Sequence, residues 1–162
     1  MTSQKHIAVI GAGLMGHGIA LTMACAGHTV TITDPIEDAR QSVCKRTAHS
    51  MQTMGLTDKD ICQSLKRIDV FGCIAAAVKD ADIIFEAAPE KMGLKQAIFA
   101  DVETHASDHC ILASNTSVMP ITQIMSELQL KNRAVGAHWW NPPQMIPLVE
   151  VVKTEWTDAA MA

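Results

Sequence analysis

The stretch that decides the fold reads His6-Ile7-Ala8-Val9-Ile10-Gly11-Ala12-Gly13-Leu14-Met15-Gly16. The short apolar run before the glycines predicts a strand buried on both faces, and the small and apolar residues after them predict a helix to about Ala26. Gly11 permits a tight turn, Gly13 lets the phosphates of a ligand approach the backbone, and Gly16 lets the helix pack closely on the strand. The first helical turn, with Leu14 and Met15, offers unpaired N–H groups and a positive dipole end to such phosphates.

An acidic residue follows the glycines at the distance that a dinucleotide site requires. Residues 29–33 read as a second strand, and Asp34 comes directly after it, 18 positions beyond Gly16. The glycine spacing is a weak signal alone, but between a strand and a helix and with this carboxylate it predicts dinucleotide binding. Asp34 is placed to accept hydrogen bonds from a ribose diol and would repel a 2′-phosphate. Because Arg40 stands a turn and a half farther along the next helix, we expect no arginine beside Asp34 and therefore NAD rather than NADP.

The rest of the chain alternates helical and extended patterns. Helices are predicted over 36–54, 57–65, 74–78, 91–105 and 121–128, and strands over 68–70, 82–86, 110–114, 134–138 and 148–152. In helix 91–105, Leu94, Ile98 and Val102 recur at turn spacing and predict its buried face. The alternation predicts an α/β fold with a doubly wound, mainly parallel sheet, which is a Rossmann-type dinucleotide-binding domain. The 162 residues fit a single domain.

Composition limits the partners. Hydrophobic residues make up 48% of the chain and charged residues 19%, which is typical of a folded globule. The net charge is −4 with dispersed basic residues, and no apolar run approaches a membrane span, so we expect neither nucleic acid nor a membrane as partner. The five cysteines are widely spaced without a Cys-x-x-Cys pair, which indicates reduced thiols and a cytoplasmic location. We expect no bound metal, because His105 and His109 stand at a helix end without a third ligand.

One imidazole and one carboxylate in the last third of the chain have the chemistry for proton transfer. His138 ends a predicted strand, and Glu150 lies twelve positions later within an apolar strand. A histidine can exchange a proton near neutral pH, and a neighbouring carboxylate orients the ring and stabilises its cation. Pro142 and Pro143 force a turn between the two residues, so that they can face each other.

Four segments stand in an order that resembles one known family. They are Ile10 through Gly16, Glu86-Ala87-Ala88-Pro89-Glu90-Lys91, Ala113-Ser114-Asn115-Thr116-Ser117 and His138 through Glu150. Together they closely resemble the NAD-binding domain of the L-3-hydroxyacyl-CoA dehydrogenase family over essentially the whole chain. The resemblance implies an oxidoreductase of fatty acid metabolism, in which NAD takes a hydride from a small-molecule substrate.

The resemblance also implies roles for individual residues. His138 would be the general acid–base and Glu150 its partner. Ser117 and Asn141 would line the substrate and nicotinamide site, and Asn115, at the same strand end, would lie with them at the edge where open α/β sheets bind ligands. The remaining implied contacts are those of Glu90 and Lys95 with the cofactor and of Ser50 with the CoA portion of the substrate.

Two departures from the family pattern bear on the substrate. A lysine that helps to hold CoA in relatives falls near Thr57, and the pair after the catalytic histidine is Trp139-Trp140 instead of two phenylalanines or smaller groups. Because side chains alternate along an extended segment, Trp140 is expected on the side of His138, where it would crowd a long acyl tail. A short-chain 3-hydroxyacyl-CoA is therefore the first prediction. The alternatives are a small free hydroxy acid such as carnitine, whose cation would meet the indole faces, and a non-catalytic dinucleotide-binding module.

Family members carry a second, helical domain that closes the active site and makes most of the dimer contact. Residues 157–162 read as the cap and first turn of another helix. We therefore expect residues 1–162 to be the NAD-binding part of a longer protein that forms a homodimer through the helical domain.

Overall fold

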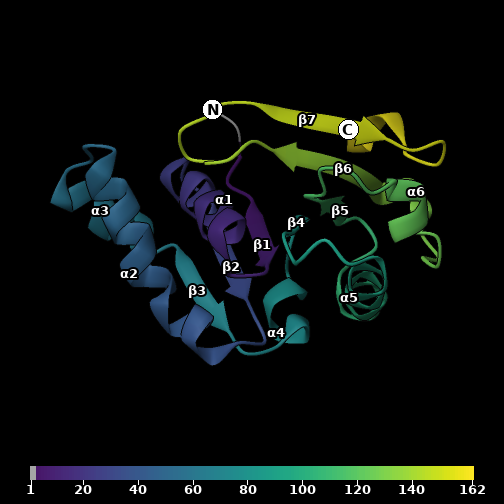
Figure 1. Ribbon diagram of the computed structural model, residues 1–162, viewed down its shortest axis with the longest axis horizontal. Helices are drawn as coiled ribbons and strands as arrows, with labels where there is room; N and C mark the ends of the chain where they lie inside the picture. Colours follow the sequence, from purple (N-terminus) through teal and green to yellow (C-terminus); the bar gives the residue numbers. More distant parts are fainter. Residues whose placement is uncertain (1–2) are drawn as a thin grey trace.

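A seven-stranded sheet forms the centre of the computed structural model, which describes residues 3–162 (Figure 1). Its strands are β1 (His6–Ile10), β2 (Thr29–Thr33), β3 (Ile68–Phe71), β4 (Ile83–Glu86), β5 (Ile111–Ser114), β6 (Ala134–Trp139) and β7 (Val149–Lys153). They lie in the order β3-β2-β1-β4-β5-β6-β7. All neighbours pair in parallel except β7, which runs antiparallel to β6. The prediction of a doubly wound, mainly parallel sheet is confirmed.

Helices cover both faces of this sheet (Figure 1). The first group is α1 (Leu14–Cys25), α2 (Glu37–Thr53) and α3 (Asp58–Leu65), and the second is α4 (Ile74–Val78), α5 (Met92–His105) and α6 (Ile121–Ile124). Successive residues of a strand point to opposite faces, so Ile7 and Val9 of β1 pack with α1, while Ala8 and Ile10 pack with α4 and α5. Two apolar cores therefore lie on the two sides of one sheet.

The strand order places a crevice at the middle of the sheet. From β1 the chain proceeds outward to β2 and β3, and then crosses back to β4 on the other side of β1. The loops that follow β1 and β4 leave toward opposite faces at such a point, and open α/β sheets bind ligands there, at the carboxyl ends of the strands.

Two predicted helices are shorter than expected. The pattern over 121–128 predicts one helix, but α6 ends at Ile124, and Met125 has φ −107° and ψ 22°. Met125 and Leu128 are nevertheless buried, so the apolar spacing there reports packing in the core instead of continuous helix. Residues 157–162, where the cap and first turn of a helix are predicted, contain a short 3-10 turn, η2 (Ala159–Met161). A similar turn, η1 (Lys131–Arg133), precedes β6.

Candidate active site

A cavity of about 1150 Å³ opens at the carboxyl edge of the sheet, where the strand order reverses. One end lies between the glycine loop after β1 and the end of β2, and the other end reaches the residues that follow β5 and β6. Pockets for drug-sized ligands measure roughly 300–1,000 Å³, so this cavity has room for a ligand as large as a dinucleotide.

The glycine loop has the backbone that its spacing predicts. Gly11 has φ +100°, and a Cβ atom there would lie 2.7 Å from the carbonyl oxygen of Ala87. A Cβ atom on Gly16 would lie 1.7 Å from the Gly11 oxygen, so Gly16 serves helix–strand packing and does not itself line the cavity. A Cβ atom on Gly13 would meet nothing within 4 Å, which leaves the loop open to a ligand. The predicted residues of this loop that do line the cavity are Gly11, Gly13, Leu14 and Met15.

Asp34 lines the cavity at the end of β2 and is bonded to the backbone on both sides. Its Oδ2 atom accepts a hydrogen bond from the N–H of Ala12 at 2.8 Å, and its Oδ1 atom accepts one from the N–H of Ile36 at 2.8 Å. The carboxylate therefore ties the glycine loop to the end of β2.

The expectation that no arginine lies beside Asp34 was wrong. The Nη1 atom of Arg40 donates to the carbonyl oxygen of Asp34 at 2.6 Å. Arg40 is in the first turn of α2, and helical side chains point back toward the helix N-terminus, which brings the guanidinium to the end of β2.

A second arginine, which the sequence analysis missed, holds the glycine loop from behind. Arg46 of α2 donates from Nη2 to the carbonyl oxygen of Ala12 at 2.5 Å and from Nη1 to that of Gly13 at 3.3 Å. The 33 positions between Gly13 and Arg46 hide this contact in the sequence. The result is a fixed positive charge beside the loop that is open to phosphates.

His138 and Glu150 face each other across the β6–β7 pair. They are direct partners in the antiparallel register, so their side chains lie on the same face. The Nδ1 atom of His138 lies 2.7 Å from Oε2 of Glu150, and its Nε2 atom lies 3.1 Å from the hydroxyl of Ser117. The hydrogen bond from His138 lowers the pKa of the Glu150 carboxyl, and one from Trp140 lowers it further. An ionised carboxylate can only accept hydrogen bonds, so the Nδ1 atom of His138 must carry the proton that it donates to Glu150. The Nε2 atom, on the other side of the ring, faces the cavity.

Glu90 fixes the loop that holds Ser117. Its carboxylate accepts hydrogen bonds from the hydroxyl of Thr116 at 2.9 Å and from the backbone N–H of Ser117 at 2.8 Å. Glu90 also lines the cavity, as expected for a residue that borders the cofactor. It therefore controls the position of the hydroxyl that meets His138.

Lys95 lies beneath the cavity and does not line it, in contrast to the prediction that it borders the cofactor. Its side chain is fully buried, and its ammonium lies 2.8 and 3.0 Å from the two carboxylate oxygens of Glu86 and 3.5 Å from Oε2 of Glu90. The Glu86 carboxylate is also buried and accepts a further bond from the hydroxyl of Ser114. A resemblance in sequence could not show that this lysine points into the core of the sheet.

Asn115 joins the ends of two strands. Its Oδ1 atom accepts a hydrogen bond from the backbone N–H of Trp139 at 2.9 Å, which ties the segment after β5 to the last residue of β6. Asn115, Ser117, His138, Trp140 and Asn141 all line the same end of the cavity. The predicted catalytic side chains are thus brought together; Glu150 does not itself line the cavity but contacts His138 from behind.

The two neighbouring tryptophans have different surroundings. Trp140 is 44% exposed, and its ring centroid lies 5.7 Å from that of His138. Trp139 is 6% exposed and packs edge-on against Phe85, with centroids 5.6 Å apart and an interplanar angle of 88°. The expected alternation therefore holds: Trp140 faces the site and Trp139 packs beneath the strand end.

Ser50 does not line the cavity. It lies on α2, with its hydroxyl 3.5 Å from the Nε2 atom of His17 on α1. The His17 ring is buried and bonds through Nδ1 to the carbonyl oxygen of Gly13 at 3.1 Å. Ser50 therefore adjoins the outer side of the glycine loop, and its contact with a CoA portion stays a prediction.

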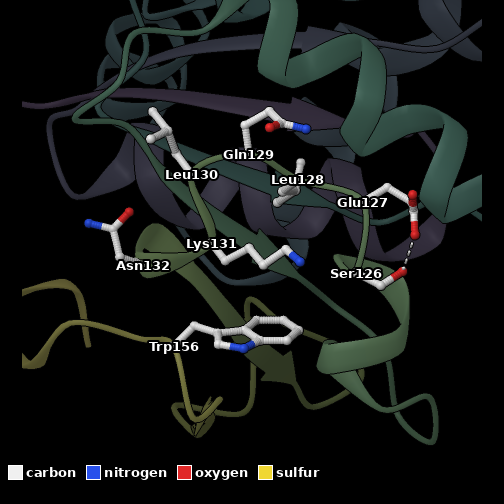
Figure 2. Close-up of a pocket in the computed structure, with 8 residues that line it drawn as sticks. All are labelled: Ser126, Glu127, Leu128, Gln129, Leu130, Lys131, Asn132 and Trp156. Atoms are coloured by element: carbon white, nitrogen blue, oxygen red, sulfur yellow. Dashed lines mark hydrogen bonds between the residues drawn. The ribbon is translucent and has the colours of Figure 1, made fainter.

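A second hollow, of about 610 Å³, lies at the amino end of β6 (Figure 2). Residues 126–132 and Trp156 line it, and the ammonium of Lys131 lies 4.9 Å from the centroid of the Trp156 ring. This hollow is at the edge opposite to the one where sheets of this kind bind ligands. It brings no acid–base pair together and we assign no chemistry to it.

A sheet of this topology, with an imidazole–carboxylate pair at the far end of the glycine-loop cavity, defines the dinucleotide-binding domain of an oxidoreductase. Residues 6–162 match the family described as 3-hydroxyacyl-CoA dehydrogenase, NAD binding domain. The chain belongs to this family and is its NAD-binding domain, as the four sequence segments indicated. The open backbone at Gly13 and the carboxylate of Asp34 fit the NAD cofactor of that domain.

Named relatives agree with this assignment. The mitochondrial hydroxyacyl-coenzyme A dehydrogenase of Rattus norvegicus is 36% identical over an alignment of 162 positions, which covers 94% of this chain and 52% of that protein. A glyoxysomal fatty acid beta-oxidation multifunctional protein of Brassica napus is 33% identical over an alignment of 156 positions, which covers 94% of this chain and 22% of that protein. The crystal structure of 3-hydroxybutyryl-CoA dehydrogenase from Escherichia coli superposes with a TM-score of 0.90 at 34% identity, covering 98% of this chain and 34% of that one. The chain thus spans about half the length of the rat protein and a smaller share of the other two relatives.

The prediction of a cytoplasmic location was wrong, since these eukaryotic relatives are named mitochondrial and glyoxysomal. All five cysteines are free, but free thiols indicate a reducing environment and do not identify the compartment. No helix within residues 3–162 is long and apolar enough to cross a membrane. Within the same residues, no three His, Cys, Asp or Glu side chains are grouped as a metal ion would require.

Proposed function

We propose that the protein containing this chain interconverts a short-chain L-3-hydroxyacyl-CoA and its 3-ketoacyl-CoA, with His138 and Glu150 as the acid–base pair. The observation that supports this most directly is the orientation of the imidazole. Its Nδ1 side is bonded to an ionised carboxylate, and its Nε2 side faces the NAD cavity next to Ser117. A domain that only binds a dinucleotide has no need of these three side chains together.

In the oxidation direction, the Nε2 atom of His138 accepts the proton of the substrate hydroxyl. Glu150 stabilises the imidazolium that forms, and it keeps the proton of Nδ1 on the side away from the substrate. The Ser117 hydroxyl, 3.1 Å from Nε2, orients the substrate oxygen by a hydrogen bond. Bound NAD would accept the hydride that leaves the carbon bearing this hydroxyl. In the reduction direction, His138 returns the proton to the oxygen.

The short acyl chain follows from Trp140. Its indole lines the cavity beside His138 and takes up volume that a long tail would need. The name of the Escherichia coli relative, 3-hydroxybutyryl-CoA dehydrogenase, also supports a short-chain hydroxyacyl-CoA. A small free hydroxy acid with a cationic group, such as carnitine, is the second candidate, because the exposed indole face could attract a quaternary ammonium.

Three substrates separate these candidates: 3-hydroxybutyryl-CoA, a long-chain 3-hydroxyacyl-CoA and carnitine, each assayed with NAD in the longest form of the protein. We expect the highest kcat/KM with 3-hydroxybutyryl-CoA. A preference for the long chain would refute the role of Trp140 in chain length, and activity with carnitine alone would favour the second candidate. Binding of NAD without turnover of any hydroxy compound would favour a non-catalytic module.

We further propose that a second, helical domain in the same protein closes the cavity and forms a homodimer. The greater length of the relatives supports this, since this chain spans 52% of the rat protein. Residues 1–162 alone should then bind NAD but turn over slowly, because exclusion of water and orientation contribute much of the rate in such sites. A full dehydrogenase rate and a dimer, measured by light scattering, for residues 1–162 alone would contradict the proposal.

A further inference from the structure

The Glu150 carboxylate is held by two donors on the same oxygen. Its Oε2 atom accepts from Nδ1 of His138 at 2.7 Å and from the indole Nε1 of Trp140 at 3.3 Å. From its place in the sequence, Trp140 is expected to limit the length of the acyl chain and to offer an aromatic face to a cationic substrate. The indole N–H adds a further property, a polar contact with the partner of the acid–base residue.

We propose that Trp140 is a positioning residue for proton transfer, whose indole N–H keeps the Glu150 carboxylate turned toward His138. This inference rests on the proposed role of the His138–Glu150 pair and goes beyond it, because it assigns to the altered aromatic pair a part in the chemistry as well as in substrate size.

The position of Glu150 explains why such a donor matters. Glu150 lies on β7, at the edge of the sheet, and its side chain is 51% exposed, so water competes for the carboxylate. Within residues 3–162, only His138 and Trp140 donate to this carboxylate, and His138 is the only titratable group in contact with it. With a single hydrogen bond, the carboxylate can still rotate about the Cγ–Cδ bond of Glu150. Two donors to the same oxygen, both from β6 and the residue after it, restrict that rotation.

The strand register accounts for the reach of the indole. His138 is the direct cross-strand partner of Glu150, and Trp140 stands two positions farther along the same chain. A residue at that diagonal position is close enough for an aromatic side chain to contact the partner. The ring centroid of Trp140 also lies 5.7 Å from the imidazole centroid at an interplanar angle of 43°, within the distance at which an aromatic ring can attract a cation.

The three tryptophans of the chain allow a matched comparison. Trp140→Phe removes the N–H that bonds Glu150 and keeps an aromatic ring beside His138. Trp139→Phe removes a buried indole N–H that has no acceptor among the described residues. Trp156→Phe alters the distant hollow at the amino end of β6.

In the longest form of the protein, Trp140→Phe should lower kcat about threefold to tenfold, the range expected for one hydrogen bond to a charged, partly exposed group. The KM for NAD should stay at the parent value. The acidic limb of the kcat/KM profile should move to lower pH, because a carboxylate that is no longer held toward His138 stabilises the imidazolium less. Trp139→Phe should leave the pH profile in place, and Trp156→Phe should leave both kcat and the profile in place.

A direct measurement on residues 1–162 complements the kinetics. In a pH titration by NMR, the indole N–H resonance of Trp140 should shift together with the Glu150 carboxyl, and the shift should disappear in Glu150→Gln. The inference is wrong if this resonance is insensitive to Glu150, or if Trp140→Phe and Trp139→Phe have the same kcat and pH profile. The proposed function itself would fail differently, through unchanged turnover in Glu150→Gln and His138→Asn.

Discussion

The ammonium of Lys95 lies 2.8 Å from the carboxylate of Glu86, and neither side chain is exposed to solvent. This pair joins α5 to the end of β4 directly beneath the cavity, and the same ammonium approaches Glu90, which holds the Ser117 loop. The pair thereby links α5 and the end of β4 to the segment that carries Ser117.

Removal of one partner of this pair should be costly. Lys95→Met leaves the Glu86 carboxylate buried without its counter-charge, and we expect a loss of about 3–5 kcal/mol in the free energy of unfolding, measured by urea denaturation. Lys5→Met is the matched control, because Lys5 pairs with Asp82 at 3.5 Å with both side chains partly exposed, and should cost less than about 1 kcal/mol. The double variant Lys95→Met/Glu86→Gln should recover part of the loss. Equal costs for the two lysines would show that the buried pair has no special weight.

His138 and Glu150 should behave as one unit. In the longest form of the protein, His138→Asn should lower turnover by about 10²–10⁴-fold, as expected for loss of a general acid–base, and Glu150→Gln by a smaller factor. The double variant should be little worse than His138→Asn, while NAD affinity stays nearly unchanged. Losses that multiply in this double-mutant cycle would argue against coupling through the 2.7 Å contact.

The choice between NAD and NADP should depend on two side chains at the end of β2. Asp34→Ser removes the carboxylate that faces the predicted ribose and should weaken NAD binding by roughly 1–3 kcal/mol, measured by calorimetry. It should also improve NADP binding, because the Arg40 guanidinium already lies at the Asp34 carbonyl and can meet a 2′-phosphate. Asp34→Ser/Arg40→Gln should lose that improvement. Equal or tighter binding of NADP by the parent chain would overturn the assignment of Asp34.

The buried imidazole of His17 should make stability depend on pH. Burial lowers its pKa below the ordinary value, and the nearby Arg46 acts in the same direction. The unfolded state therefore binds a proton near the ordinary pKa of about 6.5, and the folded state binds it only at lower pH. Stability should be complete above pH 6.5 and fall as pH decreases from 6.5 toward the folded-state pKa. Thermal unfolding between pH 5 and 8 should show this decrease in the parent and a smaller one in His17→Gln; identical slopes would contradict it.

The elements that position the site could be predicted because each rests on a local pattern. The run of residues 6–16 joins a buried strand, three glycines with separate steric uses and a helix, and the structure has all of them at those positions. The prolines between His138 and Glu150 predict a turn that lets these two residues face each other. The antiparallel register of β6 and β7 makes them direct partners.

The features that escaped prediction depend on contacts between distant segments. Arg46 reaches the glycine loop because α2 packs against α1, whereas Arg40 reaches the end of β2 because its side chain points back toward the start of α2. On α5 the apolar spacing predicts Leu94 as buried, yet Leu94 is 39% exposed while Lys95 and Phe99 are inside. Hydrophobicity alone directs a lysine outward, and only the partner charge on β4 explains its burial.

The cross-strand register of β6 and β7 has a consequence for how such proteins diversify. The distance between imidazole and carboxylate is set by the ladder that pairs Val135 through Trp139 with Lys153 through Val149 and by the indole of Trp140, whereas residues 141–148 have no part in it. Insertions, deletions or substitutions in residues 141–148 can therefore reshape what enters the cavity without a change in the contacts of the His138–Glu150 pair. Mutations that change the substrate and mutations that change the chemistry then fall in different parts of the gene, the first in this connection and the second in the two strands that flank it.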